Sequence, residues 1–93
     1  MTDAPHDPDL QAMADDELSR ACTLSWRELS RVTPWGDTFE GVAPGGRYVE
    51  VERNYIWAQE SGGDILVEIV VSGGASRYAQ GARASRIIKK GNA

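Results

Sequence analysis

The residues that most plainly suggest chemistry are the cations near the C-terminus. Residues 73–93 hold five basic side chains and no acidic one. If residues 76–90 form a helix, a projection at about 100° per residue places the cations opposite the apolar residues. Such a face can bind phosphates or an acidic protein surface, although a solvated face whose lysines complement the helix dipole is the plainer alternative. The cations predicted to bind a partner are Arg77, Arg83, Arg86, Lys89 and Lys90.

Two further residues are distinguished by their type and place. Trp35 lies in a connector between a proline and a glycine, where we expect it to be partly exposed and predict a role in partner binding, because aromatic side chains commonly anchor interfaces. Arg53 alternates with apolar residues, so its charge must reach solvent, pair with a carboxylate or line a site. Trp26 and Trp57 are expected to fill the seam between helix and sheet.

The sequence holds no set of residues typical of catalysis or of a cofactor site. A single cysteine, Cys22, excludes an intrachain disulfide and leaves too few thiols for structural zinc. A nucleophilic Cys22 would need a histidine, and the only one, His6, precedes the predicted helices. Carboxylates such as Glu50, Glu52 and Glu68 could act as acid and base if they cluster on the sheet, but a solvated strand face is the favoured explanation. We therefore expect no enzyme, no metal and no cofactor.

The composition indicates one small globular domain. The 93 residues are 41% hydrophobic and 26% charged, which are ordinary globular values. A net charge of −4 argues against nucleic acid or an anionic membrane as the main partner, and no apolar run approaches the roughly 20 residues that span a bilayer. The N-terminus lacks the features of a secretory signal, so a cytoplasmic location is expected. We expect residues 1–9 to be a flexible acidic leader and residues 10–93 a single α+β domain.

The first part of this domain is expected to be helical. Asp7 and Pro8 suit an N-cap and a first helical position, and Asp15 or Asp16 offers a second start. Apolar residues at three- and four-residue spacing predict a helix over about 16–32, with a stripe of Leu18, Cys22, Ser25, Leu29 and Val32.

Two local signals bound this helix. Ser25 and Glu28 form a capping-box pattern, so the helix is expected to break near Thr23. Pro34 ends it, because the residue before proline is pushed out of the α region.

From Asp37 onward the apolar residues alternate, which predicts antiparallel strands joined by glycine turns. We expect a short strand over 38–42 and a long one from near Arg47, with a turn over 43–47. A second turn over 61–63 pairs Glu60 with Asp64 and places Trp57 opposite Val67. One face then carries Val49, Val51, Tyr55, Trp57, Ile65, Val67, Ile69 and Val71, and the other carries Glu50, Glu52, Asn54 and Glu68.

The last segment is ambiguous. Residues 76–90 are rich in alanine and cations and end in two lysines and Gly91, which favours a helix, whereas Arg86 to Ile88 could end a strand. The predicted fold is therefore α+β, with an N-terminal helix, a three-stranded antiparallel sheet and a C-terminal helix. A fourth strand in place of the last helix is the alternative.

Residues 73–80 read Gly-Gly-Ala-Ser-Arg-Tyr-Ala-Gln. With the predicted element order, this segment resembles the double-stranded RNA-binding domain, whose last helix is entered through a Gly-x-Gly-x-Ser-Lys-Lys-x-Ala-Lys type of motif. The serine and one cation match, whereas tyrosine replaces the second lysine and glutamine the alanine. The resemblance is one of topology.

The function favoured by these observations is a small non-enzymatic interaction or adaptor module that binds a protein partner. Its binding surface would be the basic helix, the acidic leader or an exposed sheet edge. The alternative is nucleic-acid binding through the basic helix, and a third reading is a small enzyme that uses carboxylates and Arg53. No membrane partner is expected, and a homo-oligomer is left open.

Overall fold

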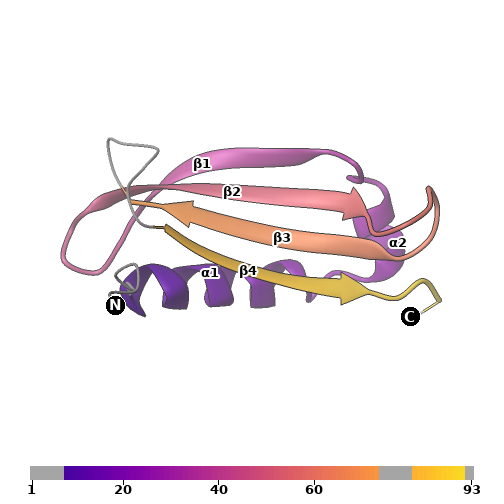
Figure 1. Ribbon diagram of the computed structural model, residues 1–93, viewed down its shortest axis with the longest axis horizontal. Helices are drawn as coiled ribbons and strands as arrows, with labels where there is room; N and C mark the ends of the chain where they lie inside the picture. The colour runs from indigo at the N-terminus through magenta and orange to yellow at the C-terminus, as the bar shows by residue number, and fades with distance from the viewer. Residues whose placement is uncertain (1–7, 74–80, 92–93) are drawn as a thin grey trace, which may run out of the picture.

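The computed structural model describes residues 8–73 and 81–91, which form an α+β fold (Figure 1). The elements are α1 (Pro8–Ala21), α2 (Trp26–Ser30), β1 (Gly36–Val42), β2 (Tyr48–Trp57), β3 (Ile65–Ser72) and β4 (Gly81–Ile88). The four strands form one antiparallel sheet in the order β1-β2-β3-β4. Helix α1 packs along β3 and β4, and the short α2 contacts β3.

The helical region is divided in two, and the predicted break near Thr23 is confirmed. Helix α1 begins at Pro8, where a missing N–H costs nothing, and buries Leu10, Ala14, Leu18 and Ala21. Helix α2 begins with the predicted capping box: Ser25 Oγ accepts the Glu28 N–H at 3.2 Å, and Glu28 Oε1 accepts the Ser25 N–H at 2.9 Å. These bonds satisfy amides that a helix start otherwise leaves unpaired, which lets a helix of five residues form.

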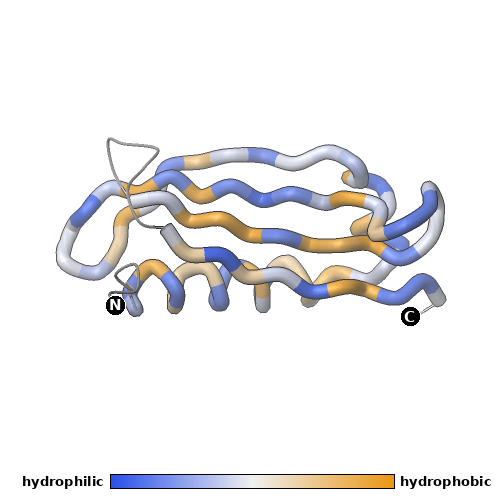
Figure 2. Tube along the Cα trace, viewed as in Figure 1, coloured by the Kyte–Doolittle hydropathy of each residue, from blue (hydrophilic) through white to orange (hydrophobic). Residues whose placement is uncertain are grey.

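The two faces of the sheet are those predicted from the alternation. The face toward α1, here called the helix face, buries Val49, Val51, Tyr55, Ile65, Val67, Ile69 and Val71 and half-buries Trp57, while the opposite open face carries Glu50, Glu52, Asn54 and Glu68. Figure 2 shows β3 as the most hydrophobic strand, broken by one polar position, and β1 as mostly hydrophilic. This contrast fits the position of β3 inside the sheet, between β2 and β4, and of β1 at its edge.

The register of the β2–β3 hairpin differs from the prediction by two residues. Trp57 pairs with Ile65 rather than with Val67, and the Ala58 N–H donates to the Asp64 carbonyl at 2.8 Å. The loop is therefore longer than the predicted three residues. A shift by two keeps every side chain on its face, so the pattern of burial could not reveal it.

The predicted C-terminal helix is wrong over residues 81–88, where the chain forms β4, and the alternative of a fourth strand is correct. Residues 76–80 lie outside the described residues. Pairing with β4 satisfies the backbone groups of β3 that an edge would leave free, and it buries Ala82 against α1. These tertiary gains outweigh the helix propensity of an alanine- and arginine-rich segment. Without a C-terminal helix, the topological resemblance to the double-stranded RNA-binding domain does not hold.

Because α1 lies mainly over β3 and β4, it covers little of the β1 side of the helix face, where Met13 approaches Gly41. Every residue of β1 except Gly41 is exposed, and Phe39 on its helix face is partly open to solvent. The core instead lies under α1, where Ile65, Val67, Ile69 and Val71 of β3 are fully buried. The uncovered part of the helix face is where the candidate site lies.

Candidate functional site

The predicted basic face is not formed, because a strand sends alternate side chains to opposite faces. Arg83 lies on the open face, where its Nη1 is 3.3 Å from Glu68 Oε2, whereas Arg86 lies on the helix face. Lys89 Nζ is 3.7 Å from Asp64 Oδ2, and Lys90 Nζ lies 5.6 Å from the centre of the Trp26 ring. Arg77 lies outside the described residues.

The carboxylates considered as acid and base lie on the open face of the sheet. Glu50 and Glu52 are exposed on β2, and Glu68 contacts Arg83 and Asn54. Each therefore has the solvated or ion-paired surroundings of a surface residue. In the described part of the chain, no three potential ligands among histidine, cysteine, aspartate and glutamate lie close enough to hold a metal ion.

Cys22 is a half-buried free cysteine directly after α1. Burial raises the pKa of its thiol above the usual value, while the charge and hydrogen bond of Arg86 act in the opposite direction. The neutral thiol is therefore favoured, which is unlike an activated nucleophile. Cys22 also borders a shallow pocket of about 350 Å³ whose other walls include Ser25, Trp26 and Ile88.

Trp35 is the predicted site residue whose setting is most unusual. It is 71% exposed, so the expected exposure is confirmed. Leu24, in the turn between the helices, and Val32, just after α2, are each 39% exposed. Three large apolar side chains from two connectors thus lie at one end of the molecule without burial in the core.

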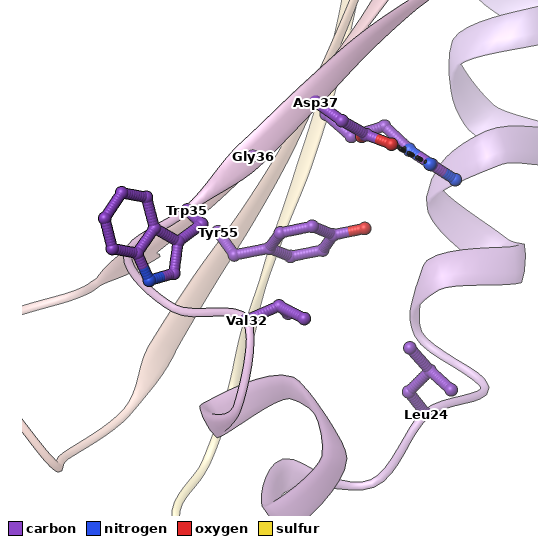
Figure 3. Close-up of a pocket in the computed structure, with 7 residues that line it drawn as sticks. Leu24, Val32, Trp35, Gly36, Asp37 and Tyr55 are labelled. Carbon is purple, nitrogen blue, oxygen red and sulfur yellow. Dashed lines mark hydrogen bonds and ion pairs between the residues drawn. The ribbon is translucent and has the colours of Figure 1, made fainter.

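These residues surround a pocket of about 250 Å³ (Figure 3). Tyr55 of β2 forms an inner wall, and its ring points from the sheet toward the space beside Val32. Leu24 faces the same space from the α1 side, whereas the Trp35 ring points outward at the rim. Gly36 completes the wall, and a Cβ there would lie 2.3 Å from the Arg53 carbonyl oxygen, so only glycine allows this approach to β2.

An ion-pair network closes one side of the pocket. Arg53 donates from Nε to Asp37 Oδ1 at 2.7 Å and from Nη2 to Asp37 Oδ2, and its Nη1 lies 3.3 Å from Glu17 Oε2 of α1. The guanidinium also lies 4.9 Å from the centre of the Phe39 ring. Of the fates expected for Arg53, pairing with carboxylates is therefore the one observed, and the pair lines a pocket as well.

The network fixes the charges of its members. The hydrogen bonds from Arg53 hold the pKa of Asp37 below its usual value, and the same bonds raise the pKa of Arg53. Burial raises the pKa of Tyr55, which keeps its hydroxyl neutral. Each of these shifts takes the pKa of its group further from neutral pH.

Most of this pocket was missed by the sequence analysis. Leu24 was not singled out, and Val32 was assigned to the buried stripe of a helix that in fact ends before it. The available signal was that Leu24, Val32 and Trp35 fall in connectors next to helix ends, where large apolar residues need a tertiary explanation. The pairing of Asp37 with Arg53 depends on the register of β1, which the sequence analysis did not assign.

No helix in the residues described has the length and apolar character needed to cross a bilayer. Comparison with protein-family models, with curated proteins and with solved structures finds no match for this chain, so its function has to be inferred from the geometry above.

Proposed function

We propose that this protein is a non-enzymatic binding module that holds a protein partner at the pocket beside Trp35. The observation that carries the proposal is the exposure of Trp35, Leu24 and Val32 around one pocket next to a sheet edge. Single exposed apolar residues are common on protein surfaces, but a contiguous group around a hollow is typical of an interaction site. Tryptophan is also enriched among the residues that dominate binding energy.

The charged groups of the site support binding rather than chemistry. Arg53 is engaged by Asp37 and Glu17, so no isolated charge is left to act on a substrate. The separation of Arg83 and Arg86 onto opposite faces of β4 supports a protein rather than a nucleic acid as the partner, because phosphate contacts need cations gathered on one surface.

Trp35→Ala tests the proposal, and the chain offers a matched control. Tyr48 is 73% exposed at the opposite end of β2 from Tyr55, so Tyr48→Ala removes an equally exposed aromatic side chain away from the pocket. The wild-type protein and both variants are used as bait with extract from the native cell, and any captured protein is purified and titrated against each by calorimetry. We expect Trp35→Ala to weaken binding about thirtyfold, which corresponds to about 2 kcal/mol, and Tyr48→Ala to leave it within about threefold.

Equal affinity of the wild-type protein and Trp35→Ala for every partner would overturn the proposal. So would binding to duplex RNA or DNA with a steep dependence on salt, because that result would indicate phosphate contacts. Circular dichroism of both variants distinguishes lost binding from lost folding.

A further inference from the structure

β1 is an edge strand beside the pocket, with one side that no other described strand pairs with. The Ala43 N–H donates to the Arg47 carbonyl at 2.7 Å, and the Tyr55 N–H donates to the Trp35 carbonyl at 3.2 Å. In an antiparallel ladder, hydrogen-bonded residue pairs alternate with non-bonded pairs. Between Trp35 and Ala43, the residues of β1 that bond to β2 are therefore Asp37, Phe39 and Gly41. The N–H and C=O groups that point away from β2 therefore belong to Gly36, Thr38, Glu40 and Val42. Within the described residues, no strand pairs with this side of β1, whose seven residues include no proline.

The pocket opens at the start of this edge. Gly36 and Asp37 line the pocket and begin β1. A strand added along β1 would send alternate side chains to the helix face, where Asp37 and Phe39 of β1 are exposed. A side chain on that face beside Asp37 would reach the apolar walls formed by Leu24 and Val32. Main-chain bonds would then hold the added strand while one apolar side chain fixes its position.

The charge around the edge indicates the composition of the added strand. Within the paired segments of β1 and β2, the charged residues are four carboxylates and one guanidinium: Asp37, Glu40, Glu50, Glu52 and Arg53. Glu40 pairs directly with Glu50, and like charges directly opposite each other in a ladder are unfavourable. A basic segment would relieve this repulsion, and an acidic one would increase it.

A second copy of the chain suits the edge less well. Two β1 edges would add the carboxylates of Asp37 and Glu40 in one copy to those of the other, and neither β1 would supply a cation to offset them. The basic edge of β4 has the right charge, but Gln11 Nε2 of α1 already donates to the outward Arg83 carbonyl at 3.1 Å. A partner strand at that edge would have to displace this bond.

We propose that the partner segment is an extended, basic stretch of another protein that adds to the sheet beside β1 and places one large apolar side chain in the pocket next to Trp35. This inference rests on the proposed function, because it names the binding mode and the partner chemistry of the same site.

Proline substitution at the edge tests the binding mode. Thr38→Pro removes an outward N–H while the bonds between β1 and β2 remain, since proline is tolerated on an edge strand with its nitrogen toward solvent. Thr38→Val is the matched control that retains the N–H. Ser85→Pro is the control at the opposite edge of the sheet. Alternate residues of β4 direct their N–H and C=O groups away from β3, and because the Arg83 carbonyl points away, the Ser85 N–H does so too.

The probe is a display library of random peptides of about twelve residues, selected against the wild-type protein. The most enriched peptide is labelled with fluorescein and titrated against each variant by anisotropy. We expect the enriched peptides to carry a net positive charge and at least one large apolar residue. Thr38→Pro should lower the affinity for the peptide by about tenfold or more, whereas both controls should bind it within about threefold of wild type. Added salt should weaken binding, because exposed charges are screened.

The outcomes separate the two proposals. Loss of binding in Trp35→Ala with full binding in Thr38→Pro would overturn strand addition and leave the proposed function standing. Full binding in both variants would overturn both proposals. Enrichment of neutral or acidic peptides, or of no peptide, would overturn the proposal of a basic partner. The same proposal would fail if sedimentation shows that the wild-type protein self-associates and that Thr38→Pro abolishes this association, because the occupant of the edge would then be a second copy.

Discussion

The ion pair between Asp37 and Arg53 allows a quantitative test of how β1 is held. Asp37→Asn keeps the size of the side chain and one acceptor oxygen but removes the charge. Charge-assisted double hydrogen bonds are stronger than neutral ones, but the side chains of Asp37 and Arg53 are 50% and 30% exposed, so solvent screens the attraction. We expect a loss of about 1 kcal/mol in the free energy of unfolding at about pH 7, which corresponds to a Tm lowered by about 4–8 °C for a domain of this size.

The sign of the pH dependence follows from the depressed pKa of Asp37 in the folded state. A group of this kind stabilises the fold above its unfolded pKa, near 3.9, and the stabilisation is lost as the pH falls through the lower folded value. The stability gap between wild type and Asp37→Asn should therefore be largest near neutral pH and close toward about pH 2. Urea denaturation of both proteins across this range measures the gap.

A matched control is provided by Asp16, whose Oδ2 lies 2.9 Å from Arg20 Nη2 on the exposed face of α1. Both side chains are more than half exposed, so Asp16→Asn should cost less than about 0.5 kcal/mol. If Asp37→Asn is no more destabilising than Asp16→Asn, or if its effect is the same at low and neutral pH, the ion pair does not hold β1 as inferred.

Three further predictions follow from side chains near the site. Leu29 is the fully buried residue of α2, so Leu29→Ala should cost about 2–5 kcal/mol in chemical denaturation, whereas Val32→Ala should cost less than about 1 kcal/mol because Val32 is partly exposed. Trp26 Nε1 donates to the Gly63 carbonyl at 2.8 Å, and Trp26→Phe should lower stability by about 1–2 kcal/mol; an unchanged denaturation midpoint would show that the bond contributes nothing. Cys22 should react with iodoacetamide more slowly in the folded protein than in urea at the same pH, because its raised pKa and partial burial disfavour the thiolate, and equal rates would contradict this.

The sequence determined the features that depend on neighbours along the chain. The capping box at Ser25 and Glu28 is formed within four residues, so it was predictable without knowledge of the rest of the fold. The faces of β2 and β3 followed from alternation, because a strand that places Val67 in the core also places Ile65 and Ile69 there. The exposure of Trp35 followed from its place in a connector.

Tertiary structure decided what depends on partners distant in the chain. The hairpin register could slip by two residues without changing a face, and the observed loop is fixed by distant contacts, since Trp26 binds the Gly63 carbonyl and Asp64 accepts the Lys90 N–H at 2.9 Å. Residues 81–88 form a strand although their local composition favours a helix, because β3 offers an unpaired edge and α1 a surface for Ala82. The pocket likewise exists only in the folded chain: its apolar walls come from two connectors and from Tyr55 of β2, and its ion pair joins Asp37 to Arg53 across two strands.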